Sequence, residues 1–368
     1  MNVYLDYAAT SPLRAEVLER MLPCLKENFG NPDSLHAYGR RAAFLVTEAR
    51  DRIAEVLGVR PNEIYFTSGG TEADNWAVCG LSQDGGVLAS PVEHAAVLTP
   101  LSRLPRCAVC RAGEDGVISP AALAEALSGR EISLVAVMAV NNETGVIQPV
   151  PELAAAAHEQ GALFFSDCVQ ARCCDLKALT AVCDAASLSA HKLGGPKGVG
   201  LLWVRKGVRL SPLIAGGEQE RALRGGTLNV AGIVGMAEAL SLARSEREAF
   251  ISHTRVLRDA FEAHILSALN GEARIDGVEA ERAPNLSHIT FARGGEWLLS
   301  ALDLRGIACS GGAACSAHAA RPSHVMLAMG RTEEEAKRGV RFSFGQETTA
   351  EEMRFAAETV AELLRERR

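Results

Sequence analysis

The sequence predicts an α/β protein built on a mostly parallel β-sheet with helices on both faces. From residue 64 onward, short apolar runs alternate with stretches of helical periodicity, and parallel strands buried on both faces have this continuous apolar character. The predicted strands cover residues 64–66, 87–89, 132–140, 162–165 and 199–204. Polar and glycine-rich segments directly follow several of these runs. Because ligands gather at the carboxyl ends of such strands, we expect a functional site there.

Composition narrows the class of protein further. The chain has 368 residues, of which 48% are hydrophobic and 23% charged, as is usual for a soluble protein of about two domains. A net charge of −7 without any basic cluster argues against a nucleic-acid partner. The start of the chain does not resemble a signal peptide, and no apolar run could span a bilayer. We therefore expect a cytoplasmic protein.

The first sixty residues read as two helices. Residues 4–10 form a short extended segment, after which we expect Ser11 to cap a helix that has Pro12 in its first turn and runs to about residue 28. A loop rich in turn-forming residues follows. A long helical pattern at residues 37–57 then ends at Gly58.

The rest of the chain suggests a change of domain near residue 245. Helices are expected between the strands, at residues 72–79, 120–127 and 151–160, and again at 230–242. A polar helix at 246–269 and an alternating strand at 285–291 then indicate a smaller α+β domain. We expect residues 15–245 to form a large cofactor-binding domain, and residues 1–14 with 246–368 to form the small one.

The ten cysteines do not form a small disulfide scaffold in a chain of this length. We expect most to be small core residues, including Cys24, Cys79 and Cys183. The pair Cys107 and Cys110 and the adjacent pair 173–174 both lack a second ligand pair at zinc-site spacing, so no metal is expected.

The segment Ser-Leu-Ser-Ala-His-Lys-Leu-Gly-Gly-Pro-Lys-Gly, residues 187–198, carries the strongest chemical signal. It places Lys192 at the end of a short apolar run. A lysine in a partly desolvated pocket beside a second cation has a lowered pKa and can form a Schiff base with an aldehyde such as pyridoxal phosphate. Ser189 and His191 could donate hydrogen bonds to a phosphate ester. A surface lysine before a turn is the ordinary alternative.

A glycine-rich turn at residues 67–72 links the first predicted strand of the sheet to a helix. Glycines allow close backbone approach, and the free N–H groups of Gly70 and Thr71 at a helix start would attract a phosphate. An ordinary strand-to-helix turn has the same appearance. The segment does not match the Walker pattern.

Further polar residues follow other strands. His94 could stack on a planar cofactor or act as an acid–base, although a lone histidine is more often structural. Asp167 could pair with a protonated pyridine nitrogen, with Gln170 near by, and a helix cap is the alternative. Asn142 lies in an Asn-Asn-Glu-Thr-Gly turn that offers amide donors.

In this order, these motifs resemble those of cysteine desulfurases in the class V aminotransferase superfamily, over nearly the whole chain. The resemblance implies a pyridoxal phosphate-dependent transferase of fold type I, similar to aspartate aminotransferase, with pyridoxal 5'-phosphate as cofactor. In that family the cofactor would be held through its phosphate, its ring, the oxygen side of the ring and the ring nitrogen. The implied residues are Gly70, Thr71, Ser189 and His191 for the phosphate, His94 for stacking, Asn142 and Gln170 on the ring's oxygen side, Asp167 at its nitrogen, and Lys192 for the Schiff base.

A second glycine-rich segment, residues 216–227, continues the resemblance. It is similar to the family segment in which a threonine reaches the phosphate of the neighbouring subunit's cofactor, so Thr227 takes that role and a homodimer is implied. Glu218 and Leu228 depart from the glycine and the acidic residue usual there. From the residues alone, this is a loop leading into a helix.

Cys315 is the candidate nucleophile. Small residues surround it, which is typical of an accessible loop, and a thiolate is favoured near a cation such as His318. A glycine-rich turn with an incidental cysteine is the alternative. The segment resembles the cysteine loop of desulfurases with the longer active-site loop, in which the position seven before Pro322 is Cys315 and not Cys309.

Arg341 is the candidate for binding a substrate carboxylate, since arginine is a rigid bidentate donor. It matches the family's carboxylate-binding arginine, whereas an ordinary strand arginine is the alternative. Asn31 and His36 match family positions that line the substrate side.

The predicted function is therefore that of a cysteine desulfurase, which converts L-cysteine to L-alanine and leaves a persulfide on Cys315. The sulfur would pass to an acceptor protein, such as an iron–sulfur scaffold or a tRNA-thiolation enzyme. Another class V activity, such as transamination, selenocysteine lysis or kynureninase-like cleavage, is one alternative. A sulfur-relay or scaffold subunit without turnover is another.

Overall fold

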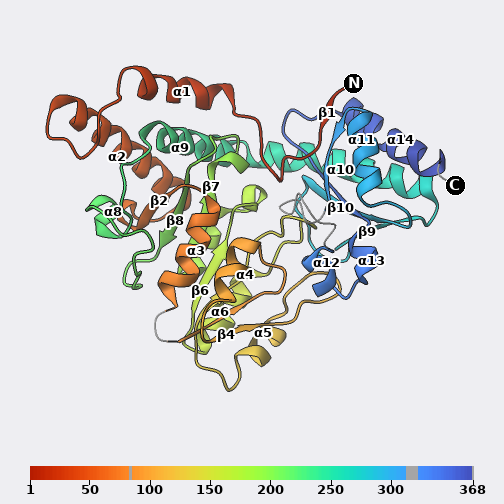
Figure 1. Ribbon diagram of the computed structural model, residues 1–368, viewed down its shortest axis with the longest axis horizontal. Helices are drawn as coiled ribbons and strands as arrows, with labels where there is room; N and C mark the ends of the chain where they lie inside the picture. The colour runs from red at the N-terminus through yellow and green to blue at the C-terminus, as the bar shows by residue number, and fades with distance from the viewer. Residues whose placement is uncertain (83–84, 312–321, 367–368) are drawn as a thin grey trace.

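The structure is a computed structural model that describes residues 1–82, 85–311 and 322–366. Figure 1 shows two lobes of unequal size, with the long helix α10 (Arg247–Leu269) running into the smaller one. The N-terminal strand β1 (Val3–Tyr4) and the last helix α14 (Ala350–Glu366) both lie in the smaller lobe (Figure 1). The two ends of the chain therefore contribute to the same lobe.

The larger lobe contains a seven-stranded sheet in the order β2-β8-β7-β6-β5-β3-β4. Its strand β8 is antiparallel to both neighbours, and all other pairings are parallel, which confirms the mostly parallel sheet. The strands are β2 (Ile64–Thr67), β3 (Gly86–Ala89), β4 (Cys107–Val109), β5 (Ile132–Ala136), β6 (Leu163–Asp167), β7 (Ala185–Ser189) and β8 (Gly200–Val204). The predicted strand 132–140 is thus shorter than expected. Its last residues still bond to the neighbouring strand, through Val137 N–H to the Phe165 carbonyl and Ala139 N–H to that of Asp167.

Helices cover both faces of this sheet, as predicted. On one face α3 and α4 pack through an apolar cluster that includes Trp76, Leu81 and Val97, and on the other face a larger cluster joins the remaining helices to the strands. The helices of this lobe are α1 (Ala15–Lys26), α2 (Ala37–Leu57), α3 (Gly70–Leu81), α4 (Ala95–Leu101), α5 (Pro120–Leu127), α6 (Val150–Glu159), α7 (Leu176–Val182), α8 (Gln219–Ala222) and α9 (Val230–Ser245), with short 3-10 turns η1 (Pro61–Glu63), η2 (Ala171–Cys173) and η3 (Ala190–Lys192).

The start of the first helix differs from the prediction. Helix α1 begins at Ala15 after Arg14, so Ser11 is not its cap. The Ser11 hydroxyl instead donates to the His191 carbonyl at 2.7 Å and accepts from the Gly194 N–H at 2.8 Å. A long-range partner has therefore taken the side chain that a local rule assigned to the helix. Helix α2 ends as predicted, with Gly58 at a φ of 67°.

The smaller lobe is an α+β structure. It contains a four-stranded antiparallel sheet in the order β12-β13-β10-β9 and a parallel pair of β1 with β11. The elements besides β1, α10 and α14 are β9 (Ala273–Ile275), β10 (Leu286–Phe291), β11 (Ile307–Ala308), β12 (Ser310–Gly311), β13 (Gly339–Ser343), α11 (Glu296–Leu304), α12 (His324–Ala328) and α13 (Glu333–Ala336). Its own apolar core combines Val3 and Leu5 with residues between 257 and 364. This separate core supports our proposed division into residues 15–245 and residues 1–14 with 246–368.

Three predicted core cysteines have different environments. Cys24 and Cys183 are buried, as predicted, whereas Cys79 is exposed on α3, so that prediction was wrong. Within the described ranges, no helix is long and apolar enough to cross a membrane. No group of three or more potential ligands in that part of the chain could hold a metal ion.

Candidate active site

The candidate residues come together at the carboxyl ends of the central strands. Strand β7 leads directly into η3, which carries His191 and Lys192, and its neighbour β6 ends at Asp167. Strand β2 ends at the glycine-rich turn that opens α3. The parallel topology thus places three separate motifs at one edge of the sheet, as the sequence predicted.

The amine of Lys192 points at the N-terminal segment. Its Nζ donates to the carbonyl oxygens of Ala8 at 2.5 Å and Ala9 at 2.8 Å, and the Gln170 Nε2 donates to the same Ala8 oxygen at 2.8 Å. Two predicted cofactor residues therefore share one acceptor. The N-terminal segment forms a wall of the site, and nothing in its own sequence indicated this.

The residues predicted to bind phosphate are closely packed. A Cβ atom on Gly70 would lie 2.8 Å from a methyl carbon of Val169 and 3.6 Å from the Ser189 Cβ, so only glycine fits between them. The Ser189 hydroxyl is buried and has no hydrogen-bond partner in the described part of the chain. An unpaired buried hydroxyl costs free energy, which a bound phosphate oxygen would recover.

His191 is neutral at physiological pH. Burial, together with the positive charges of Lys192 and Lys197, lowers the pKa of His191 to about 4. Its Nδ1 lies 3.1 Å from the Thr10 hydroxyl. His191 therefore does not supply the second cation that we expected beside Lys192, but a neutral imidazole still has one N–H to donate.

Asp167 is buried with a second carboxyl group, Asp74 of α3. Burial raises the pKa of Asp167, while a hydrogen bond from the Val169 N–H and the charges of His94 and Lys192 lower it. Burial also raises the pKa of Asp74 well above its usual value, and the charge of Asp167 adds to that effect. Asp74 accepts from the Ser187 hydroxyl at 2.5 Å. Because two buried carboxylates repel one another, the site favours a charged Asp167 beside a protonated Asp74.

His94 is held by its own helix. Its Nδ1 accepts from the Ala96 N–H at 3.1 Å, which caps α4 and fixes the direction of the ring. The preceding residue, Glu93, is fully buried and accepts from the Ser90 hydroxyl and the Met138 N–H. Burial raises the pKa of Glu93 to about 8. The turn before His94 is therefore fixed from within the core.

Arg341 is buried in the middle of the small-lobe sheet, on β13, with only 2% of its surface exposed. Its Nη2 donates to Asp6 and its Nη1 to the Asn142 carbonyl, each at 2.8 Å. Its Nε has no partner among the described residues. The guanidinium thus links both lobes and the N-terminal segment, and retains a buried donor for a ligand carboxylate.

Cys315, with its neighbour His318, lies outside the described residues, but both flanks of its segment are fixed. Before it, Ser310 of β12 pairs with Arg341. After it, the Ser323 hydroxyl donates to the buried Glu143 at 2.5 Å, and the His324 Nε2 lies 2.8 Å from the Glu93 carbonyl oxygen. The segment that contains Cys315 therefore begins beside Arg341 and ends beside the turn that carries His94.

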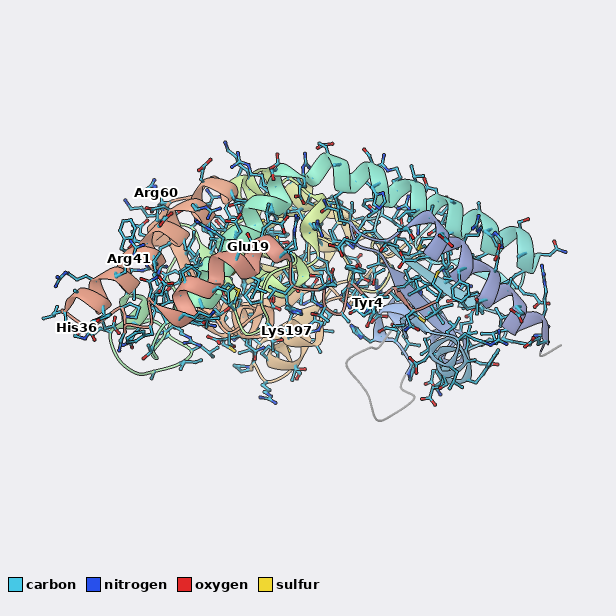
Figure 2. All side chains as sticks on the ribbon, turned by 90° about the horizontal axis from the view of Figure 1, so that it is seen from above. Tyr4, Glu19, His36, Arg41, Arg60 and Lys197 are labelled. Carbon is cyan, nitrogen blue, oxygen red and sulfur yellow. The ribbon has the colours of Figure 1, made fainter. Side chains whose placement is uncertain are left out.

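Three predicted residues do not join this cluster within one chain. Asn31, His36 and Thr227 are all exposed. His36 accepts from the Gly39 N–H as the cap of α2, and Figure 2 shows it at the far end of the large lobe, away from Lys197 and Tyr4.

The sequence analysis missed several residues of the site. Asp6, Ala8 and Asp74 are described above, and Arg172 lines a cavity of about 10 Å³ beside Lys192, Tyr7 and Phe344, which is room for a single water. Burial lowers the pKa of Arg172 to about 10, and its guanidinium lies 4.0 Å from the centre of the Phe250 ring. In the sequence, only the position of Arg172 two residues after Gln170 indicates that it belongs to the site.

The residues present fit a phosphorylated pyridine aldehyde. The unpaired Ser189 hydroxyl and the close packing at Gly70 suit its phosphate, the buried Asp167 suits a protonated ring nitrogen, and Lys192 ends η3, which begins directly after Ser189. This donor set is the one that such a group requires.

Comparison with known proteins gives a consistent result. The family model described as aminotransferase class-V matches residues 3–355. The curated cysteine desulfurase IscS of Dictyoglomus turgidum is 40% identical over 374 residues, covering 99% of this chain and 94% of that protein. Two similar solved structures are a NifS-like protein, 34% identical with a TM-score of 0.91 over 99% of this chain and all of that one, and SspA in complex with cysteine, 31% identical with a TM-score of 0.80 over 93% and 98%.

Proposed function

We infer that this chain, which belongs to the aminotransferase class-V family, is a cysteine desulfurase of the NifS/IscS-like group. The full-length similarity to curated desulfurases supports the activity. The observation that carries the proposal within the structure is the position of Arg341. The Arg341 guanidinium, to which we assign carboxylate binding, donates to the turn that carries Asn142. Arg341 also pairs with β12, the strand that precedes the segment with Cys315.

We propose that pyridoxal 5'-phosphate is the cofactor. Gly70, Thr71, Ser189 and His191 would hold its phosphate, Asp167 its ring nitrogen and Lys192 its aldehyde carbon, with His94, Asn142 and Gln170 around the ring. When bound, the cofactor supplies an electron sink that makes the substrate's α hydrogen acidic. Asp167 would keep a proton at the ring nitrogen, and its burial beside a protonated Asp74 maintains that charge.

Arg341 and Lys192 would handle the substrate. Arg341 would bind the carboxylate of L-cysteine through its available buried donor, while Asp6 and the Asn142 carbonyl keep the guanidinium plane fixed. The Lys192 amine, once free, would move a proton from the α carbon. The carbonyls of Ala8 and Ala9 give that amine a defined resting position.

Cys315 would carry out the sulfur transfer. Its thiolate attacks the sulfur of the substrate, so a sulfur–sulfur bond forms as the carbon–sulfur bond breaks. The electron pair stays with the substrate carbon, which takes up a proton. L-cysteine and one protein thiol thus give L-alanine and a persulfide on Cys315. An acceptor protein, for iron–sulfur cluster assembly or tRNA thiolation, would then take the sulfur.

We also propose a homodimer, in which Thr227 contributes to the neighbouring phosphate site and Asn31 and His36 face the neighbouring substrate. The loop between α1 and α2, together with the start of α2, exposes large apolar side chains, as surfaces that bind another protein do. Phe29 is 70% exposed, Leu35 90% and Tyr38 59%. Phe29 stacks on Tyr38, whose ring centre lies 6.2 Å from that of His36, and Leu35 precedes His36 in the chain, so a second copy would cover them and receive His36 together.

The decisive experiment is incubation of the purified protein with L-cysteine and a reductant, with alanine and sulfide measured in the same samples. We expect equal amounts of the two, and their loss in Cys315→Ala. Cys315→Ser should keep the absorbance of the bound cofactor, which shows that the site is intact.

Other outcomes would contradict the proposal. Pyruvate without alanine would indicate elimination chemistry, and a fully active Cys315→Ser variant would exclude this nucleophile. A protein that binds no cofactor and makes no alanine would be a relay or scaffold subunit instead.

A further inference from the structure

The segment 216–227 contains the most strained backbone of the described chain. Glu220, Arg221 and Ala222 are consecutive non-glycine residues with φ values of 47°, 60° and 61°. Side chains disfavour this left-handed region, and such runs persist only where surrounding contacts determine them. Strain of this kind usually marks a functional segment.

The carboxylate of Glu220 holds the first part of this segment against the sheet. It accepts from the Phe66 N–H at 2.9 Å, on the open edge of β2, and its side chain is 1% exposed. Arg50 of α2 donates to both of its oxygens, at 2.5 and 3.2 Å, and to the Ile64 carbonyl at 2.6 Å. Glu220 therefore replaces a missing neighbouring strand at the point where β2 approaches its glycine-rich turn.

Arg224 holds the other part of the segment against the far end of that turn. Its Nε and Nη2 donate to the two oxygens of Glu72, at 2.9 and 3.1 Å. Glu72 also accepts from the Ser68 N–H at 2.8 Å, inside the turn. Both side chains of the pair are mostly buried, with exposed fractions of 19% for Arg224 and 10% for Glu72.

The segment that carries these two anchors closes on itself. Gly216 and Gly225 pass so closely that a Cβ on Gly225 would lie 2.6 Å from the Gly216 Cα, and the Gly225 N–H donates to the Ile214 carbonyl. The anchors therefore belong to one rigid unit. That unit touches the chain just before the phosphate turn, at Phe66, and just after it, at Glu72.

We propose that Glu220 and Arg224 are positioning residues. Their contacts, made from outside the sheet, hold the phosphate turn at residues 67–71 in its conformation. This inference rests on the proposed function, since it takes the turn to bind the cofactor's phosphate. Neither residue needs to touch the phosphate. The Arg224–Glu72 pair fixes the direction of the Ser68 N–H and of the first turn of α3. The Glu220–Arg50 pair fixes β2, the strand that leads into them. The same rigid unit ends at Thr227, so each subunit's own phosphate turn is tied to the residue that we assign to its neighbour's site.

The test compares two ligands that differ only in the phosphate. The full-length protein is first freed of cofactor and then dialysed against a series of concentrations of pyridoxal 5'-phosphate or of pyridoxal, and occupancy is read from the absorbance of the bound ligand. In Arg224→Gln we expect the affinity for pyridoxal 5'-phosphate to fall at least about tenfold and that for pyridoxal less than about threefold. Arg224→Lys, which keeps the charge, should recover part of the loss.

Controls separate this role from general stability. Arg106→Gln removes an arginine from an exposed pair with Glu131 and should leave both affinities unchanged. Glu72→Gln keeps the shape of the residue and its contact with Ser68, so it tests the charge pair if Arg224→Gln does not fold. Equal losses of affinity for the two ligands, or no loss for either, would overturn this positioning role. If the unmodified protein binds neither ligand, the proposed function fails instead.

Discussion

At the scale of single residues, the site depends on charged groups that are buried and already paired before any substrate arrives. Arg341 donates to Asp6 and to the Asn142 carbonyl and is almost completely enclosed. Its orientation therefore requires no adjustment on binding, which reduces the entropy cost of recognition.

Substitution of Arg341 by lysine should separate charge from geometry. Lysine keeps the positive charge but cannot reproduce the planar donor set, so kcat/KM for L-cysteine should fall about 10- to 150-fold, the equivalent of one charged hydrogen bond of roughly 1.5–3 kcal/mol. Steady-state alanine production measures this. Arg338→Lys, at a partly exposed position near the same strand, should behave as the unmodified enzyme. An Arg341→Lys variant with unchanged kcat/KM would contradict carboxylate binding by Arg341.

The lowered pKa of His191 predicts that the stability of the protein depends on pH. Burial lowers its pKa from 6.5 to about 4, so between these values the unfolded chain holds a proton there that the folded chain does not. Stability from this group is complete above pH 6.5 and is lost as the pH falls toward 4. We expect a loss of about 1–2 kcal/mol after allowance for solvent screening. Urea unfolding of cofactor-free protein measures it, and His191→Gln should flatten this part of the profile. Equal slopes in both proteins would refute the assignment.

The predicted site residues that lie together in the structure share one property. Asp167 ends a buried strand, and Lys192 and Gly70 follow the ends of two others, so the local pattern also determines where they lie in space. Asp6 and Asp74 have no such local signal. Asp6 reaches the site through pairing with a residue 335 positions away, and Asp74 through burial of one face of α3. Sequence reasoning finds residues whose position follows from a single element.

At the scale of elements, the strained turn of segment 216–227 makes a direct prediction about stability. Ala222 has a φ of 61° and an exposed side chain, so glycine relieves the strain without removing a contact. Ala222→Gly should raise the free energy of unfolding by about 0.5–1 kcal/mol, since the relief of strain exceeds the entropy gained by the unfolded chain.

A matched substitution provides the control. Ala155→Gly lies at an exposed position inside α6 and should lower the free energy of unfolding by about 1 kcal/mol, as glycine does in helices. Chemical denaturation of both variants gives the comparison. If Ala222→Gly is as destabilising as Ala155→Gly, the left-handed conformation is not a source of strain.

Prediction of elements succeeded where periodicity was long and failed at short edge segments. Helix α2 was predicted with its bounds and its glycine cap because 21 residues of amphipathic pattern leave little ambiguity. Strand β4 has three residues, two of them exposed, and lies at the edge of the sheet, so it carries no apolar signal. Ser11 had the sequence of a helix cap but bonds to the η3 region, and a tertiary partner overrode the local preference.

At the scale of the whole molecule, the proposed dimer can be tested by mixing two defective chains. Lys192→Ala removes one group of a site, and Thr227→Ala removes a group that we assign to the neighbouring site. After subunit exchange, each mixed dimer should contain one intact site and one doubly defective site. An equal mixture should then show about a quarter of the unmodified activity from intact sites, well above the mean of its parents. Analytical ultracentrifugation confirms the dimer, and activity no greater than the parental mean would place Thr227 in its own subunit's site.

The N-terminal segment has a consequence for how the protein is made. Residues 3–10 leave the ribosome long before their partners do: Val3 pairs with Ile307, and the Ala8 N–H donates to Ser343, 335 positions further along. Domains generally fold as units during synthesis. The large lobe can therefore fold while the N-terminal segment, which contacts Lys192, still lacks its partners in the small lobe. A nascent chain therefore cannot assemble a complete catalytic centre before translation has passed Ser343.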